Sequence, residues 1–110
     1  MKIDLIILVL IIFIINSKII KSEVILTRYL LYQWFGDDLL SLETLNLERK
    51  EITSIESQTF IGMTSLLSLS LASNQLTILE SNVFDGLTNL KSLSLYSNRL
   101  TKSMQMHSMI

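Results

Sequence analysis

The sequence predicts a short α/β solenoid in which 24-residue repeats each contribute one strand to a parallel sheet. The apolar residues of positions 42–65 recur 24 positions later in residues 66–89, and residues 90–100 continue the pattern. Within each repeat, two leucines two positions apart precede a turn position, which is typical of a short strand with one buried face. Self-similarity at a fixed period of this length indicates stacked supersecondary units instead of one globule.

The composition excludes several functional classes. At 110 residues, the chain has room for one domain. It contains no cysteine, so neither a disulfide framework nor a thiolate metal site is expected. Nine basic and ten acidic residues give a net charge of -1, and no basic patch predicts binding to nucleic acid.

Residues 1–22 are predicted to be a secretory signal peptide. A charged start is followed by an apolar run of 11 residues and then by polar residues. This run has about half of the roughly 20 helical residues that a bilayer core requires. Ser22 offers a small residue for cleavage and is preferred slightly over Ser17. The alternative is an uncleaved membrane anchor that extends through Ile20, whereas cleavage after Ser22 predicts a secreted, extracellular chain that begins at Glu23.

Residues 23–41 are predicted to form an N-terminal cap. They do not keep the repeat spacing, and the terminal units of a solenoid are atypical because one face lacks a neighbour. Their apolar surface is large enough to cover the first repeat. The content of Val, Ile, Tyr and Trp favours a strand, with a short helix as the alternative. We prefer a cap to an aromatic ligand pocket, because buried aromatic side chains most often belong to a core.

Two complete repeats follow at residues 42–65 and 66–89, and residues 90–110 contain an incomplete third repeat and the tail. Each strand is expected to bury its leucines, and an irregular return path is expected to close each complete repeat at Phe60 or Phe84. Because every repeat follows the same right-handed path, the strands are predicted to be parallel and about 4.8 Å apart. The second repeat has neighbours on both sides, so we expect its layer to be packed best.

A turn position follows each strand, and Asn74 and Asn98 occupy it in the second and third repeats. A backbone group that is buried without a partner costs about 1 to 3 kcal/mol. An amide side chain has both donors and an acceptor, so stacked asparagines can bridge one turn to the next. The first repeat has Lys50 at this position, and an ammonium has donors only. We therefore expect the turn at Lys50 to be looser or open to water.

The spacing L-x-x-L-x-L-x-x-N-x-L-x-x-L, followed by N-x-F-x-G-L-x-x-L, resembles the extracellular leucine-rich repeat family over residues 42–100. The 24-residue length with Phe on the convex side resembles the class found in secreted and cell-surface proteins. The resemblance implies a short parallel sheet on the concave side and an irregular or short helical convex side. It also implies that the concave sheet binds protein ligands. Family members commonly have cysteine-rich caps, from which this chain departs.

The outward positions of the strands provide the candidate binding residues. Serines dominate these positions, and a plain solvated face is the simplest interpretation. The sharper hypothesis is a protein-binding surface anchored by Tyr96, because tyrosine and arginine often carry interface energy. Its charged and polar surroundings are Glu48, Arg49, Asn46, Lys91 and Glu43. The columns predicted to face outward are Thr44, Ser68 and Ser92; Asn46, Ser70 and Ser94; and Glu48, Ala72 and Tyr96.

No residues support catalysis, a metal site or a cofactor site. His107 is the only histidine, and the chain has no G-x-S-x-G motif or Gly-rich phosphate loop. We therefore expect a non-enzymatic protein that binds a protein ligand or receptor partner. The alternative is a truncated or structural piece of a larger receptor or adhesion protein with no ligand of its own. The incomplete third repeat leaves an open end, which is expected to favour association with another copy.

Overall fold

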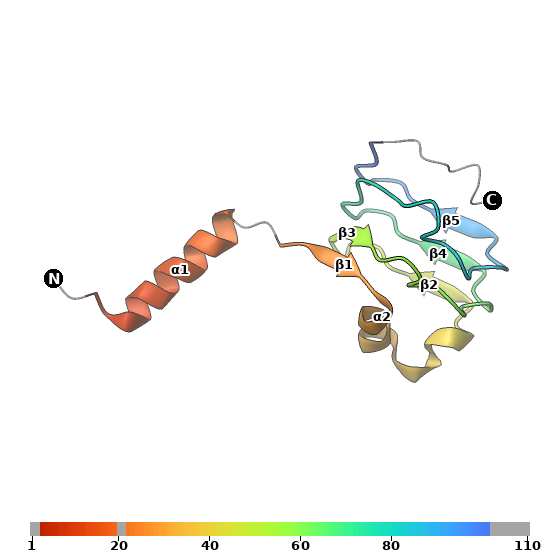
Figure 1. The fold of residues 1–110 in the computed structure, drawn as a ribbon, viewed down its shortest axis with the longest axis horizontal. Coiled ribbons are helices and arrows are strands. Elements are labelled where there is room, and N and C mark those ends of the chain that lie inside the picture. The colour runs from red at the N-terminus through yellow and green to blue at the C-terminus, as the bar shows by residue number, and fades with distance from the viewer. Residues whose placement is uncertain (1–2, 20–21, 102–110) are drawn as a thin grey trace.

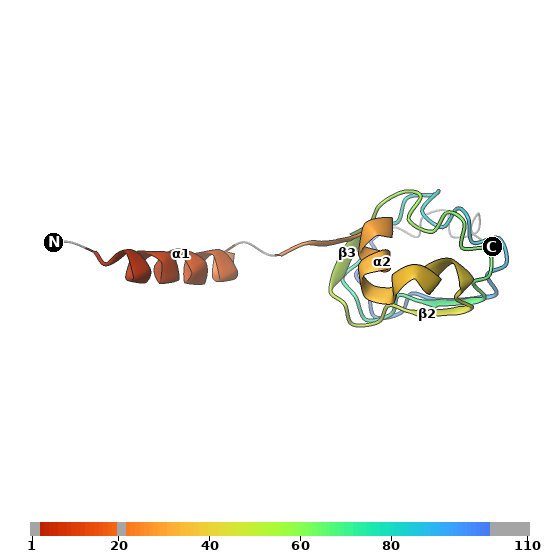
Figure 2. The ribbon, with the colours of Figure 1, turned by 90° about the horizontal axis from the view of Figure 1, so that it is seen from below.

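The computed structural model describes residues 3–19 and 22–101 (Figure 1). Its first element, α1 (Leu5–Ile19), begins where the Asp4 carboxylate accepts the N–H of Ile6 at 2.9 Å. This helix lies apart from the repeat body in both views (Figures 1 and 2). Its apolar side chains are therefore 40–72% exposed along residues 5–15. No helix in the described ranges combines the length and hydrophobicity that a membrane crossing requires.

The segment before the first repeat folds into β1 (Val24–Leu26), α2 (Arg28–Phe35) and the 3-10 helix η1 (Gly36–Ser41). The Thr27 hydroxyl caps α2 by accepting the N–H of Leu30 at 3.1 Å. The segment therefore contains both the strand and the short helix that were alternatives for it. Its completely buried side chains, which pack on the repeats, are Leu26, Leu31 and Leu39.

Three parallel strands form the main sheet, in the order β2 (Thr44–Asn46), β4 (Ser68–Ser70) and β5 (Ser92–Ser94). Their pairing keeps the 24-residue offset of the sequence, so equivalent residues of successive repeats lie side by side. The predicted short parallel strands are thus confirmed. The three inward leucines that share one register position are Leu45, Leu69 and Leu93.

A second sheet of two strands lies on the return path of the first repeat, where β1 pairs in parallel with β3 (Ile52–Ile55). An irregular path was predicted there, and the difference arises because the cap supplies a strand for the return path to pair with. Backbone hydrogen bonds continue this pairing into the later repeats. The N–H of Gln75 donates to the carbonyl of Ile52, and the N–H of Arg99 donates to that of Leu76, both at 2.8 Å.

The core of the first repeat is covered at least as completely as that of the second. Phe60 is completely buried, whereas Phe84, stacked on it with ring centroids 6.0 Å apart, is half-buried. The expectation that the second repeat is packed best is therefore wrong. The cap covers the first repeat, while the half-buried Leu93 and Leu95 of the third repeat cover the second less completely.

The return paths of the first two repeats touch backbone to backbone at Gly86, whose φ is 100°. A Cβ atom there would lie 2.6 Å from both the Cα of Ile61 and the carbonyl oxygen of Phe60. Gly62, the equivalent residue of the first repeat, also has a positive φ of 85°. A Cβ atom at Gly62 would meet only the Leu40 side chain, at 3.8 Å. Only Gly86 is therefore required by close packing between repeats.

Candidate binding face

The strands that carry the candidate face are held at their ends by an asparagine ladder, formed by Asn74 and Asn98. The Oδ1 atom of Asn74 accepts the N–H groups of Lys50 and Ile52, each at 3.0 Å. Its Nδ2 donates across to the carbonyl of Leu47 at 2.9 Å and within its own turn to that of Leu71 at 2.9 Å. One buried amide thus closes two turns.

Asn98 repeats this arrangement one repeat later. Its Oδ1 accepts the N–H of Leu76 at 3.0 Å, and its Nδ2 donates to the carbonyl of Leu71 at 2.9 Å. Each asparagine therefore serves the turn of the preceding repeat as well as its own. The prediction that the Lys50 turn is loose was wrong, because Asn74 supplies the missing acceptor from the next repeat. Among residues 22–101, no asparagine does the same for the third turn.

Each strand leaves the sheet through a residue with left-handed backbone, Arg49, Ser73 or Ser97, with φ of 56°, 58° and 57°. The first turn has a second residue in this conformation, Glu51 with a φ of 58°, so the three turns share one left-handed position without being identical. A residue other than glycine is uncommon in this region, so the asparagine bonds must stabilise the turn against that strain. Arg49 is exposed at this position.

Tyr96 is the largest exposed side chain at the carboxyl-terminal edge of the sheet, with 64% of its surface accessible. It follows β5 closely, and its carbonyl accepts the N–H of Ser73 at 2.9 Å. The backbone that carries the ring is therefore fixed to the second repeat, while the ring itself stays available to solvent.

Glu48 and Asn46 are held in place on the same edge. The Oε2 atom of Glu48 accepts the hydroxyl of Ser70 at 2.9 Å, and its N–H donates to Oδ1 of Asn46 at 2.9 Å. Ala72, predicted to face outward between Glu48 and Tyr96, is completely buried. The expectation that Ala72 adds exposed surface was therefore wrong, although backbone pairing continues past β4, where the N–H of Ser73 donates to the carbonyl of Tyr96.

Lys91 and Glu43 lie at the opposite, amino-terminal edge, because each directly precedes the first strand residue of its repeat. Lys91 is five residues before Tyr96, which corresponds to roughly 15 Å of extended chain. The structure therefore does not bring these two charges together with the tyrosine. The candidate residues form two groups, one at each edge of the sheet.

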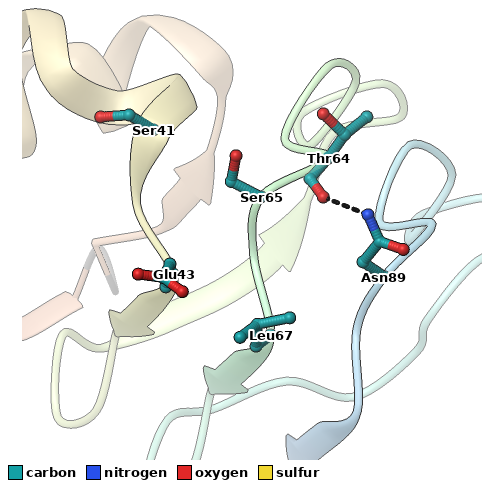
Figure 3. Close-up of a pocket in the computed structure, with 6 residues that line it drawn as sticks. All are labelled: Ser41, Glu43, Thr64, Ser65, Leu67 and Asn89. Carbon is teal, nitrogen blue, oxygen red and sulfur yellow. Dashed lines mark hydrogen bonds between the residues drawn. The ribbon is translucent and has the colours of Figure 1, made fainter.

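A shallow polar hollow of about 510 Å³ lies at the amino-terminal edge (Figure 3). Of its residues, only Glu43 was a candidate from the sequence. The signal that could have revealed it is the 24-residue column Ser41, Ser65 and Asn89, which places three polar side chains beside one another. The residues that line the hollow are Ser41, Glu43, Thr64, Ser65, Leu67 and Asn89.

Comparison with protein families agrees with the repeat geometry. The family model for the leucine rich repeat matches residues 40–100, which is more than half of the chain. The chain belongs to the leucine-rich repeat family. Leucine-rich repeat domains commonly mediate interactions between proteins. Comparison with curated proteins and with solved structures gives no match.

The exposed side chains on the three repeats of this leucine-rich repeat chain are mainly polar or charged. Leucine-rich repeat domains are generally not enzymes. Within residues 3–19 and 22–101, no three acidic or histidine side chains are grouped as a metal ion would require. The side chains that the strands present to solvent are hydroxyls, amides, isolated charges and one tyrosine. These groups suit hydrogen bonding and contact with another protein.

Proposed function

We propose that the chain is a non-enzymatic, secreted or cell-surface module that binds a protein ligand. In this proposal the repeats form a short solenoid, and the outer face of the three-stranded sheet is its concave binding surface. The observation that carries the proposal is Tyr96, a 64% exposed aromatic side chain on a backbone that is hydrogen-bonded to the neighbouring repeat. Tyrosine is among the residues that most often dominate binding energy at interfaces.

Two other side chains at the same edge of the sheet are held in place and support the same proposal. Ordering a flexible side chain on binding costs about 0.5 to 1.5 kcal/mol. Glu48 is already held by the Ser70 hydroxyl, and Asn46 already accepts the N–H of Glu48. A ligand that meets this edge therefore finds a carboxylate in one orientation and loses less entropy than on a flexible surface.

The test uses the full chain, produced in a secreting cell, as the probe against an array of extracellular protein domains. For a domain that binds, Tyr96→Ala is expected to weaken the affinity at least about tenfold, which corresponds to roughly 1.4 kcal/mol. The matched control is Tyr29→Ala, because Tyr29 is 72% exposed but lies on α2, away from the sheet. Loss of affinity with Tyr29→Ala and not with Tyr96→Ala would exclude the proposed surface.

Secretion is part of the proposal, with residues 1–22 as a signal peptide cleaved after Ser22. Ser17 lies inside α1, whereas Ser22 is exposed and lies outside regular secondary structure shortly before β1. A protease needs an accessible extended backbone, which favours Ser22. Cleavage there leaves β1 and its pairing with β3 intact. N-terminal sequencing of the secreted chain should give Glu23, and a chain that stays in the membrane fraction would support the uncleaved anchor.

Association of two copies through the third repeat is a second candidate. It is favoured by the edge position of β5 in the sheet and by the half-buried Leu93 and Leu95. Edge strands and incompletely covered repeats favour pairing with another chain. Sedimentation velocity of the secreted chain should then show a dimer that forms as concentration rises. A monomer at every concentration would count against this candidate.

A further inference from the structure

We propose that the polar hollow at the amino-terminal edge of the sheet binds one ammonium or guanidinium group, supplied by a Lys or Arg side chain of the protein ligand. This inference rests on the proposed function for the source of the cation. The hollow itself can be tested with small cations alone. It lies where the chain runs into β2, β4 and β5 (Figure 3).

The hollow combines the Glu43 carboxylate, which only accepts hydrogen bonds, with amide and hydroxyl oxygens that can also accept them. The Ser41 hydroxyl already donates to the carbonyl of Asp38 at 2.8 Å. Nδ2 of Asn89 already donates to the carbonyl of Thr64 at 2.6 Å. The carboxylate of Glu43 and the oxygen of the Asn89 amide keep their acceptor capacity. Ammonium and guanidinium groups have donors and no acceptors, so they complement this set.

Two backbone N–H groups next to the hollow are already engaged. The N–H groups of Leu67 and Ser68 both donate to the carbonyl of Glu43, at 2.8 and 3.1 Å. The negative charge of the Glu43 carboxylate would repel an anion at this edge. Leu67 is the only apolar lining residue, so an apolar ligand would bury little surface here. The chemistry of the hollow thus selects against both of these ligand classes.

Glu43 provides the charge. Within the part of the chain that the structure describes, its carboxylate has no hydrogen bond or ion pair. An incoming cation does not have to displace an internal partner. A charge-assisted hydrogen bond to a carboxylate is shorter and stronger than a neutral one.

The net charge of the rest of the repeat region is negative, like that of the Glu43 carboxylate. Residues 23–101 contain nine acidic and five basic side chains, and this excess attracts cations. Two of the basic side chains are engaged elsewhere: Arg28 donates to the carbonyls of Thr59 and Ile61, and Lys50 lies 4.8 Å from the centre of the Trp34 ring.

Lys91 sets the limit of the hollow. It occupies the same repeat position as Glu43 but two strands away, a separation of about 10 Å by strand spacing. It does not line the hollow, and its charge opposes a second cation on that side. We therefore expect the hollow to take a single cationic group.

The test is a nuclear magnetic resonance titration of the full secreted chain with n-butylammonium and, separately, N-methylguanidinium, at constant ionic strength. Saturable shifts are expected at the backbone amides of Ser65 and Leu67 and at the side-chain amide of Asn89. Tetramethylammonium has the same charge but no N–H donor, and it should give no saturable shift. Glu43→Gln should weaken binding at least about threefold, the scale of an exposed charge pair. Glu56→Gln is the control, because this exposed carboxylate lies outside the hollow.

Three results would overturn the inference. The shifts could be absent, they could be spread over the surface, or they could be equal in Glu43→Gln and the unmodified chain. Tyr96→Ala separates this outcome from failure of the proposed function. It should leave cation binding unchanged while it weakens binding of a protein ligand. If the hollow binds no cation but Tyr96→Ala still weakens binding of the protein ligand, only this inference is wrong. If the hollow binds cations but Tyr96→Ala has no effect on binding of the protein ligand, only the proposed function is wrong.

Discussion

Replacing Asn74 with Ala tests the asparagine ladder directly. The substitution removes the acceptor of the Lys50 and Ile52 N–H groups and the donor to the carbonyls of Leu47 and Leu71. Asn74 itself is only 6% exposed, so water cannot easily replace the amide. We expect Asn74→Ala to be one of the most destabilising single substitutions in the repeat body.

The size of the loss follows from the groups left without partners. An unsatisfied buried donor or acceptor costs about 1 to 3 kcal/mol. The bonds of Asn74 to Ile52, Leu47 and Leu71 are buried, and partial relaxation will recover some of their loss. We therefore expect the free energy of unfolding to fall by about 3 to 5 kcal/mol, a large part of the 5 to 15 kcal/mol typical of a domain.

Two further substitutions make the prediction specific. Asn98→Ala should cost only about 1 kcal/mol, because the bonds of Asn98 are partly exposed and water can replace them. Lys50→Asn should give no gain in stability, because no earlier repeat has a turn for residue 50 to close. It should instead lose the contact between Lys50 and the Trp34 ring, about 0.5 to 1 kcal/mol.

The assay is urea unfolding of the secreted chain, followed by the fluorescence of its one tryptophan and by circular dichroism. Equal slopes against denaturant show that the variants unfold from comparable states. If Lys50→Asn raised the free energy of unfolding by more than about 1 kcal/mol, the first turn would have lacked an amide partner. This result would refute the conclusion that Asn74 closes the turn of the preceding repeat. Should Asn74→Ala fail to fold, Asn98→Ala and Lys50→Asn still decide the question.

Two other pairs of substitutions test packing in the same assay. Gly86→Ala should destabilise the chain by about 2 kcal/mol more than Gly62→Ala. Both substitutions replace a glycine with positive φ, but only Gly86→Ala places a Cβ atom against the backbone of Ile61. Equal losses of stability would contradict the close contact. Leu71→Ala should cost about 2 to 5 kcal/mol, and Leu95→Ala clearly less, because Leu71 is completely buried and Leu95 only half-buried; comparable losses would contradict the difference in burial.

The sequence alone determined the repeat and its strands. The alternation within L-x-x-L-x-L and the constant 24-residue offset are local properties, and together they predicted parallel strands with Leu45, Leu69 and Leu93 in register. Such a pattern is readable because each repeat contacts mainly its neighbours. The position of the turn asparagines was equally visible from the spacing.

Only the tertiary structure decided how the cap and the turns meet these repeats. The pairing of β1 with β3 joins segments whose sequences carry no common pattern. The spacing does not show whether a turn asparagine bonds to the preceding or to the following repeat. The turn at Lys50 was therefore expected to be open, whereas Asn74 of the next repeat closes it. Contacts between distant segments decide these features, and a local pattern does not encode them.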